Sequence, residues 1–585
     1  MRIIRSGFAA IAVLAASLAA CARDGSAPQE GAVAVESEAA DLILENGRIY
    51  TLDPERSWAR AVAVRDGKIV YVGDDASSFS GAATKIVDLG GKLVLPAFQD
   101  SHAHIAMGGI SVFRECPVFD LASKEEVLAA IAECVAANPD APLIRGVGWR
   151  ISQFDAGMPP RKELLDAIES SRPLVFGDAD GHALWLNSKA FEQFGITKDM
   201  PDPEGGKIQR DPETGELWGT LHEESAMALV SDNMPAYTDQ EIEAGILAAQ
   251  EYFHSLGITS LTEAYVALGG KDQTRSLTAF KALNDSGKLK LRVNGALGWD
   301  PGRGLEQVED FEDARAEFSG GRFQTRSVKF WADGVIETHT AKLLEPYSDQ
   351  PETSGLMMIP RGQLIAGVQA VDAKGFQAHI HAIGDATVRY ALDAIETAEK
   401  SNGKRDARHH INHLQVIHPD DIARFAELDV VAGFEPLWAF EDSFIRNFTR
   451  PQLGPVRMNW VYPINSVLRT GAHVAFGSDW SVSSPDPLLG IETALTRVDA
   501  ISHDTPPFLP EQRISLEDAL AGYTIEAARS NFLDDMTGSI ETGKYADLVI
   551  LEKNLFEIDP SEISDAKVLV TLLEGEPVYG TLTAD

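Results

Sequence analysis

The stretch Leu95-Pro96-Ala97-Phe98-Gln99-Asp100-Ser101-His102-Ala103-His104 places two histidines one residue apart, directly after an apolar run. Residues i and i+2 point the same way on a strand, whereas they do not share a helix face. The run Lys92–Leu95 before them is typical of a strand that enters a core. A strand that ends in His-x-His presents two imidazoles suited to a borderline-soft metal such as zinc. Because paired histidines also serve structural roles, the metal interpretation requires further ligands elsewhere in the chain.

The first residues have the pattern of a secretory leader. Arg2 and Arg5 precede a short apolar run, and Cys21 follows Leu-Ala-Ala, as in a bacterial lipobox where the thiol is lipidated. We therefore expect a signal peptide over 1–21, lipidation at Cys21, and a flexible tether over 22–40. The protein would be an exported lipoprotein, anchored to the membrane at the periplasmic face of a bacterium. An uncleaved anchor, or simple secretion with Cys21 incidental, are the alternatives.

Composition limits the classes of partner and of metal site. The chain has 585 residues, of which 44% are hydrophobic and 24% charged, as in ordinary globular proteins. Its net charge of −37 disfavours binding to nucleic acid and to anionic lipid headgroups. Cys116 and Cys134 can pair in an oxidising compartment or remain two buried thiols, and their spacing is compatible with both. With three cysteines in all, a metal site must use histidines and carboxylates.

Both ends of the chain are rich in short alternating segments typical of strands, and Asp66-Gly67 is a hairpin signal. Neither end is long enough for a large core, so we expect residues 41–95 and 540–585 to form one composite β-sandwich. The middle of the chain, 96–539, alternates apolar strand-like runs with helical stretches, which indicates a parallel α/β fold. The segment around 112–245 is interpreted as an insertion with its own strands near 143–147 and 173–176.

The strand count predicts a closed barrel. After the strand that leads into His102, seven further runs read as strands, and eight parallel strands close a (β/α)8 TIM-like barrel. The seven runs are 257–263, 291–295, 327–331, 377–381, 410–414, 430–434 and 473–477. Catalytic groups in such barrels lie at the carboxyl ends of the strands. Four of the later strands carry or end in metal-capable groups, namely Lys329, His379 with His381, His409 with His410 and His413, and Asp479.

At this point the chain resembles the amidohydrolase superfamily and, within it, the amidohydrolase-3 family, over roughly residues 41–582. The resemblance rests on motifs distributed along the whole chain. They are Asp100-Ser101-His102-Ala103-His104, Asp180-Gly181-His182-Ala183, Val328-Lys329-Phe330-Trp331-Ala332-Asp333-Gly334, Leu343-Leu344-Glu345-Pro346-Tyr347, His381-Ala382-Ile383-Gly384-Asp385, His413, Gly477-Ser478-Asp479-Trp480 and Gly543-Lys544-Tyr545-Ala546-Asp547-Leu548.

The resemblance implies a binuclear zinc site. His102 and His104 would bind the more buried ion, with Asp479 as a further ligand, and His381 and His413 would bind the second. Lys329, carboxylated by carbon dioxide, would bridge both ions. A metal-bound hydroxide would attack a carbonyl, and Asp479 would act as general base and then as general acid.

The choice of histidine within each cluster also rests on the resemblance, because His379 and His381 share a strand face and we expect the same of His409 and His413. His182 is either a substrate or oxyanion contact or a structural hydrogen-bonding group. Relatives often carry Gly-Ser-Arg after the Ala-Asp-Gly motif, but this chain has Ile336-Glu337-Thr338-His339. Glu337, His339 and Trp480 are therefore further candidates for substrate contacts.

The leading hypothesis is a metal-dependent hydrolase of non-peptide C–N bonds in a small molecule, such as an amide, formamide, carbamate or N-acyl group. An ester, lactone or aminoacyl-amide hydrolase is the alternative on the same site, since the same nucleophile attacks either carbonyl. A non-catalytic, lipid-anchored binding protein is the alternative from another class, and it predicts missing ligands. The sequence itself specifies neither the substrate nor the oligomeric state.

Overall fold

The computed structural model describes residues 39–583 apart from 120, 155–157, 180, 204 and 269–272. The expected signal peptide, Cys21 and nearly all of the expected tether lie outside the described residues. Ala40, assigned above to the tether, is already part of the fold. It is buried, and its amide donates to the Phe79 carbonyl at 2.8 Å.

The central sheet is the predicted parallel barrel. Its eight strands are β8 (Phe98–Ala103), β15 (Ile258–Ala267), β16 (Arg292–Gly298), β17 (Phe323–Trp331), β18 (Gln377–Ala382), β19 (His410–His413), β20 (Val431–Phe434) and β21 (Val474–Phe476). They are ordered in space as in sequence, and every neighbouring pair is parallel. A parallel bridge between Ala103 and Trp480 joins the first strand to the segment that follows the last, in agreement with the barrel architecture.

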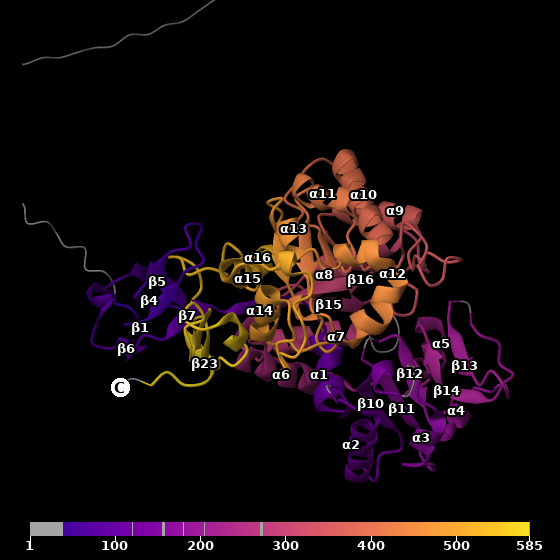
Figure 1. Cartoon of the computed structure of the whole chain (residues 1–585). Coiled ribbons are helices and arrows are strands. Elements are labelled where there is room, and N and C mark those ends of the chain that lie inside the picture. The colour runs from indigo at the N-terminus through magenta and orange to yellow at the C-terminus, as the bar shows by residue number, and fades with distance from the viewer. Residues whose placement is uncertain are drawn as a thin grey trace, which may run out of the picture. The chain divides into compact units, whose positions relative to one another are not determined.

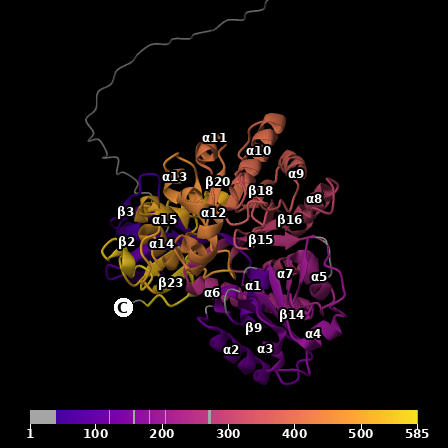
Figure 2. The same ribbon diagram turned by 45° about the vertical axis from the view of Figure 1, so that its right-hand side comes forward.

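Helices alternate with these strands, as seen in Figures 1 and 2. The main ones are α1 (Ile105–Phe113), α6 (Asp239–Ser255), α7 (Gln273–Asp285), α8 (Gln307–Phe318), α9 (Arg361–Ala373), α10 (Asp385–Asn402), α11 (Ile422–Glu427), α12 (Arg450–Arg457), α13 (Ile464–Leu468), α14 (Pro487–Thr496), α15 (Leu516–Gly522) and α16 (Ile525–Ser530). Because helices cover the outside of the barrel, its strands are buried on both faces and read as nearly continuous apolar runs. In β18, all six residues are buried.

The strand that carries His102 differs from the expectation in one respect. The apolar run before the histidines is not part of that strand. It forms β7 (Leu93–Pro96), which pairs with a strand of the sandwich, and the chain changes sheet at Ala97. The Ala97 amide donates to Asp547, whereas the Phe98 amide donates to Gly257. Both segments are fully buried, so hydrophobicity alone gives no sign of the boundary between them.

Strands near the ends of the chain build two further sheets, and the second of them takes strands from both ends, as the sequence predicts. One sheet contains β1 (Leu42–Glu45), β4 (Ala61–Arg65), β5 (Lys68–Gly73) and β6 (Lys85–Asp88). The other contains β2 (Arg48–Tyr50), β3 (Trp58–Ala59), β7, β22 (Leu548–Leu551), β23 (Val568–Leu573) and β24 (Glu576–Tyr579). The antiparallel pairing of β7 with β22 joins the two ends of the chain, so that indigo and yellow segments lie side by side in Figures 1 and 2.

The segment between α1 and α6 forms a separate α/β layer with its own core. Its six-stranded sheet contains β9 (Cys116–Pro117), β10 (Ile144–Trp149), β11 (Leu174–Asp178), β12 (Ala183–Leu186), β13 (Lys207–Arg210) and β14 (Leu217–His222). The accompanying helices are α2 (Lys124–Ala137), α3 (Lys162–Asp166), α4 (Ser188–Gln193) and α5 (Glu224–Ser231). Only β10 and β11 stand out in the sequence, because the other strands are short or irregular.

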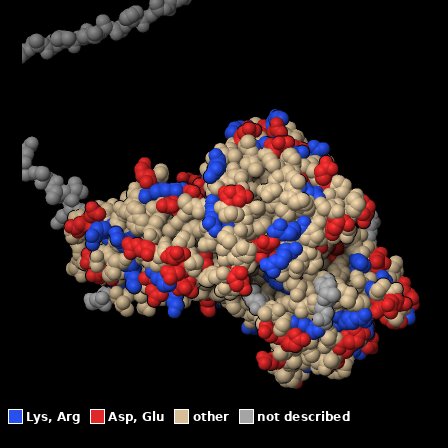
Figure 3. All heavy atoms as spheres, in the orientation of Figure 1, with Lys and Arg blue, Asp and Glu red and all other residues tan. Residues whose placement is uncertain are grey.

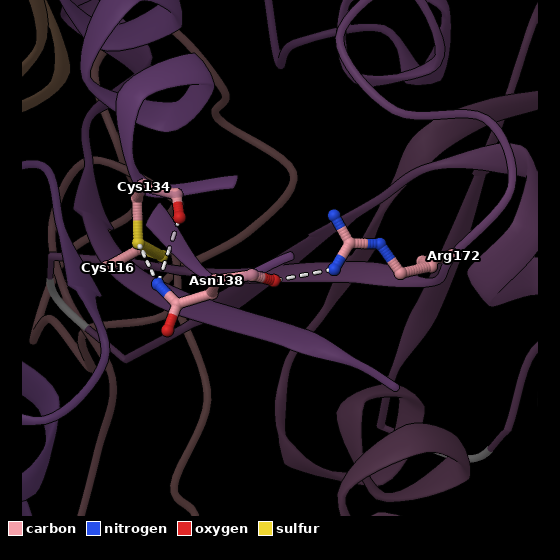
Figure 4. The surroundings of a disulfide bond; sticks show 4 residues. All are labelled: Cys116, Cys134, Asn138 and Arg172. Carbon is pink, nitrogen blue, oxygen red and sulfur yellow. Dashed lines mark hydrogen bonds between the residues drawn. A yellow bond between two sulfur atoms is a disulfide. The ribbon is translucent and has the colours of Figure 1, made fainter. Parts of the chain in front are cut away.

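Cys116 and Cys134 form a disulfide that ties β9 to α2 (Figure 4). Their Cα atoms are 5.8 Å apart. Asn138, just past the end of α2, donates from its side chain to the Cys134 carbonyl at 2.9 Å, and Arg172 donates to the Asn138 carbonyl at 2.7 Å. The disulfide therefore lies among hydrogen bonds that link α2 to the rest of the insertion. Of the two alternatives that the spacing left open, the structure shows the disulfide.

Acidic and basic side chains are interspersed on the face shown in Figure 3, and the acidic ones are not gathered into one patch. Over the described part of the chain, no helix combines the length and the apolar character needed to cross a bilayer.

Candidate metal centre

The centre of the site is the carboxylate of Asp479, which follows the last barrel strand. Its Oδ1 lies 3.1 Å from His104 Nε2 and 3.3 Å from His102 Nε2. His102 is completely buried, and the side chain of His104 is 30% exposed. Asp479 has a φ of +54°, a conformation that few non-glycine residues adopt and that turns the chain sharply at the end of the strand. An imidazole from the first strand, a second one directly after it and one carboxylate from beyond the last strand thus meet at one point.

Lys329, on β17, completes the buried side of this cluster. Its Nζ lies 3.0 Å from His102 Nε2, the atom that also faces Asp479. The residue is only 3% exposed, and burial lowers the pKa of its ammonium group to about 8. Loss of the proton is therefore much easier at Lys329 than at an ordinary surface lysine.

His413 and His381 extend the cluster along the next two strands. The ring centroids of His413 and His102 are 4.7 Å apart, and those of His413 and His381 are 4.5 Å apart. Donor atoms of His102, His413 and Asp479 all lie within 4.8 Å of one another. The six residues expected to bind metal thus form one connected group at the carboxyl ends of the barrel strands.

The structure separates His379 from His381 by depth. His379 lies one step further into the barrel, where its Nε2 is 2.9 Å from His102 Nδ1 and its ring packs on His410 at 4.7 Å. His381 lies next to His413, nearer the mouth. Strand periodicity gives both residues the same face but does not distinguish their depth.

The expectation that His409 and His413 share a face is wrong. His409 lies 3.3 Å from Asp372 on α9 and accepts the Ala378 amide through Nδ1. His413 is the last residue of β19 and has a φ of +76°, so the regular alternation of the strand does not extend to it.

Two buried carboxylates that sequence reasoning left without a role hold these ligands in place. Asp100 accepts from the His102 amide at 2.9 Å and from the Ser478 hydroxyl at 2.5 Å, which links the first strand to the last. Asp333 accepts from the Gly384 and Ile383 amides and lies 3.6 Å from His381 Nε2. Burial raises the pKa of Asp100 to about 7 and that of Asp333 to about 6. Both residues lie inside the motifs quoted above, but the sequence does not show that they are buried, and burial is what indicates their role.

Glu435 was also missed. It follows β20, is completely buried, and its Oε2 lies 3.2 Å from His413 Nδ1. A carboxylate next to a ring nitrogen of a metal-binding histidine orients the imidazole. In the sequence, a single glutamate after an apolar strand does not indicate this role.

The insertion reaches the site through His182. Its Nδ1 lies 3.1 Å from Glu223 Oε2, and its ring packs edge-on against Trp331 at 5.6 Å. Trp331, at the end of β17, also contacts the ring of His381 at 5.6 Å and is 38% exposed. Trp331 is therefore an additional site residue, because it bridges the insertion and the metal centre. Asp180 of the same motif lies outside the described residues.

The remaining candidates are engaged elsewhere. His339 pairs with Asp349 at 3.0 Å, and Glu337 accepts from Thr449 at 3.1 Å. The indole of Trp480 is buried between α1 and α6, where it packs against Phe253 with ring centroids 5.3 Å apart. These contacts link the three residues to neighbouring loops and helices, and the expected substrate contacts stay a prediction.

The protonation pattern of the cluster fits a divalent cation. Burial lowers the pKa of His102 and His381 well below the usual range, which leaves their ring nitrogens with a free lone pair. Burial opposes ionisation of Asp479, but hydrogen bonds from His102 and His104 hold its pKa well below the ordinary value. Metal ligands must be deprotonated, and imidazole with carboxylate is a donor set suited to zinc and similar ions.

Comparisons with known proteins agree with this geometry. The chain is 32% identical over 551 residues to Protein LONG AFTER FAR-RED 3 of Arabidopsis thaliana, covering 92% of each chain. It is 25% identical to an N-substituted formamide deformylase of Arthrobacter pascens, covering 92% of this chain and 97% of the relative. A crystal structure of an uncharacterized metal-dependent hydrolase from Pyrococcus horikoshii OT3 superposes with a TM-score of 0.70 at 26% identity, covering 89% of this chain and 99% of the other.

A sequence model of the amidohydrolase family matches residues 85–579, which include every strand of the barrel and each of the six clustered residues. The convergence of imidazoles, carboxylate and lysine at the mouth of an eight-stranded barrel agrees with that match. This chain therefore belongs to the amidohydrolase family.

Proposed function

We propose that the chain is a zinc-dependent hydrolase of non-peptide C–N bonds in small molecules, such as those of amides, formamides, carbamates or N-acyl groups. The observation that carries the proposal is the convergence of His102, His104, Lys329, His381, His413 and Asp479 in one buried cluster. The name of the formamide deformylase relative supports the class of bond. A binding protein without catalysis would not need to keep six such groups together.

The residues divide into two sets around the cations they would hold. His102, His104 and Asp479 would hold one ion, and His381 with His413 a second. We propose that Lys329 is carboxylated: its neutral Nζ adds to the carbon of carbon dioxide and loses a proton, which leaves a carbamate with two anionic oxygens for the two ions. The lowered pKa of Lys329 supports this step, because only the neutral amine is a nucleophile. A bound divalent cation would lower the pKa of water and polarise a carbonyl.

The chain's own groups would handle the proton and the substrate. Asp479 Oδ1 faces His102 and His104, so the proton from water would be held at Oδ2. The imidazoles keep the Asp479 pKa low, so the proton would pass readily to the leaving nitrogen. His182, oriented by Glu223, would contact the substrate carbonyl, and the exposed face of Trp331 would pack against the substrate.

Metal analysis combined with a substrate panel tests the proposal on the purified full chain. N-acyl amino acids, formamides and carbamates are assayed beside esters and lactones, with metal content measured by mass spectrometry. Lys329→Ala should lose metal and turnover together, whereas Lys374→Ala, an exposed lysine paired with Glu312, should match the wild type. Wild-type metal content and turnover in Lys329→Ala would overturn the carbamate bridge. Hydrolysis of esters without any C–N substrate would overturn the proposed bond class.

We also propose export and lipid anchoring at Cys21, on the pattern of the first 21 residues. The Cys116–Cys134 disulfide supports an oxidising compartment such as the periplasm. In a bacterial host, radiolabelled palmitate should be incorporated into the wild type and not into Cys21→Ser. Equal labelling of the two proteins, or none of the wild type, would overturn the assignment.

A further inference from the structure

A cavity lies at the opposite end of the barrel from the metal centre. Its volume is about 430 Å³, within the range of small-molecule pockets. Arg292 begins β16 and Arg322 directly precedes β17, so this cavity adjoins the amino ends of the strands. Tyr545 and Glu574, from the carboxyl-terminal part of the chain, line it as well.

The arginines at the cavity carry more positive charge than the neighbouring carboxylates neutralise. Arg292 donates to Asp547 and, at 2.7 Å, to Glu574, and Arg322 donates to the same Glu574 at 2.9 Å. Two arginines and two acids thus neutralise one another. Arg326 is a third guanidinium on the cavity wall, and no carboxylate among the described residues lies within ion-pair distance of it.

The surroundings of Arg326 favour a counter-ion. The residue is half-buried, and its guanidinium lies 5.6 Å from the Phe532 ring, against which Arg408 also packs at 4.8 Å. Burial and the charge of Arg408 both lower the pKa of Arg326. A half-buried guanidinium next to a second arginine attracts an anion, and arginine stays charged because it does not lose its proton. In a chain with a net charge of −37, such a local excess of positive charge stands out.

Two further donors at the cavity lack partners within the described residues. Asn531 is 2% exposed; its oxygen accepts from Thr262 at 2.5 Å, but its Nδ2 makes no hydrogen bond. Arg322 Nε is also buried without an acceptor. Buried donors in folded proteins are almost always satisfied, so each needs an acceptor. Both residues line the same cavity as Arg326.

We propose that this cavity binds a small anion, a carboxylate or phosphate group of a soluble metabolite, through Arg326, Arg322 Nε and Asn531 Nδ2. Planar guanidinium groups match both kinds of oxyanion. Because the walls come from the barrel and from the segment carrying Tyr545 and Glu574, the bound anion also stabilises the contact between these regions. The site is separate from the metal centre, and the proposal does not depend on the reaction catalysed there.

Calorimetric titration of the full chain with inorganic phosphate and, separately, with succinate tests the site, with sodium chloride holding the ionic strength constant. We expect at least one of the two anions to bind with a Kd below about 1 mM and to raise the melting temperature. Phosphate alone would indicate a phosphorylated ligand, and succinate alone a carboxylate ligand. Arg326→Gln should weaken binding about tenfold or more, as loss of a charge-assisted contact does.

A second variant and a matched control keep the test decisive. Gln324→Glu places a negative charge on the cavity wall and should weaken binding without removing any arginine. Arg361→Gln removes an exposed arginine of α9 that pairs with Asp393, and should bind as the wild type does. The proposal would be overturned if neither phosphate nor succinate bound to the wild type. So would wild-type affinity in both Arg326→Gln and Gln324→Glu.

Discussion

Replacement of Asp333 tests whether a single buried carboxylate holds the second half of the metal centre in place. Asp333 is completely buried and accepts four hydrogen bonds. Its Oδ1 receives the Ile383 amide, and its Oδ2 receives the amides of Gly384 and Lys342 and the hydroxyl of Thr387. These bonds fix the turn between β18 and α10, directly after His381.

The two oxygens allow a graded prediction. In Asp333→Asn, an amide oxygen at the Oδ2 position keeps three bonds, while the new NH2 group faces the Ile383 amide and leaves that amide and its own N–H groups without this acceptor. One such donor costs about 1–3 kcal/mol. In Asp333→Ala all four donors lose their acceptor, and we expect a loss of roughly 4 kcal/mol or more in the free energy of unfolding.

Urea denaturation and metal analysis measure the two consequences. Metal content should fall in the same order as stability, because displacement of the turn moves His381. Asp420→Asn is the matched control: its side chain is 83% exposed, so we expect a change within about 0.5 kcal/mol. The reasoning is refuted if Asp333→Ala retains wild-type stability and metal content, or if Asp333→Asn is the more damaged of the two.

Three further predictions concern other parts of the molecule. Burial opposes ionisation of Asp372, but hydrogen bonds, the strongest of them to His409, lower its pKa from 3.8 to about 2. The ionised carboxylate therefore contributes ~2 kcal/mol to the free energy of unfolding above pH 4, and this contribution is lost as the pH falls towards 2. In acid titrations of stability, Asp372→Asn should lack this loss, and an unchanged profile would contradict the assignment. The Cys116–Cys134 bridge closes a loop with a sequence separation of 18, which corresponds to ~3 kcal/mol, so the double serine variant should unfold at lower urea concentration than the oxidised wild type. Equal midpoints would show that the bridge contributes nothing. Trp331→Ala should lower kcat/KM by about 3- to 10-fold, as loss of an aromatic contact does, and leave metal content unchanged; a loss of metal would instead make Trp331 a structural support of the centre.

The local hydrophobic pattern was sufficient to predict the barrel, because the barrel strands are regular. Seven of the eight expected runs overlap the observed strands closely, since helices cover the barrel and each strand is a short apolar run. The first strand was placed too early, because β7 and β8 are both fully buried and only their partners distinguish them. The insertion was recognised as a break in the alternation, but most of its strands were too short to detect.

The metal-capable residues could be named from sequence because strand ends in a parallel barrel all face one side. Their supporting groups could not. Nothing in the sequence distinguishes Asp100 and Asp333 from other aspartates; only their burial and hydrogen bonds do. The role of Glu435 likewise follows only from its position next to His413. Glu337 and His339 were chosen because their stretch departs from the family pattern, and in the fold these two residues and Trp480 contact Thr449, Asp349 and Phe253 respectively.

The sequence by itself determined the order of strands and helices, the architecture of the barrel and the clusters of metal-capable residues at the strand ends, because these follow from local periodicity and from residue types. Tertiary structure alone decided which histidine of each pair lies at the centre, which carboxylates orient them, and that a surplus arginine meets a cavity at the far end of the barrel. The physical reason is that depth, burial and charge balance depend on residues hundreds of positions apart. Asp100 and Ser478, for example, are separated by 378 residues and are in direct contact.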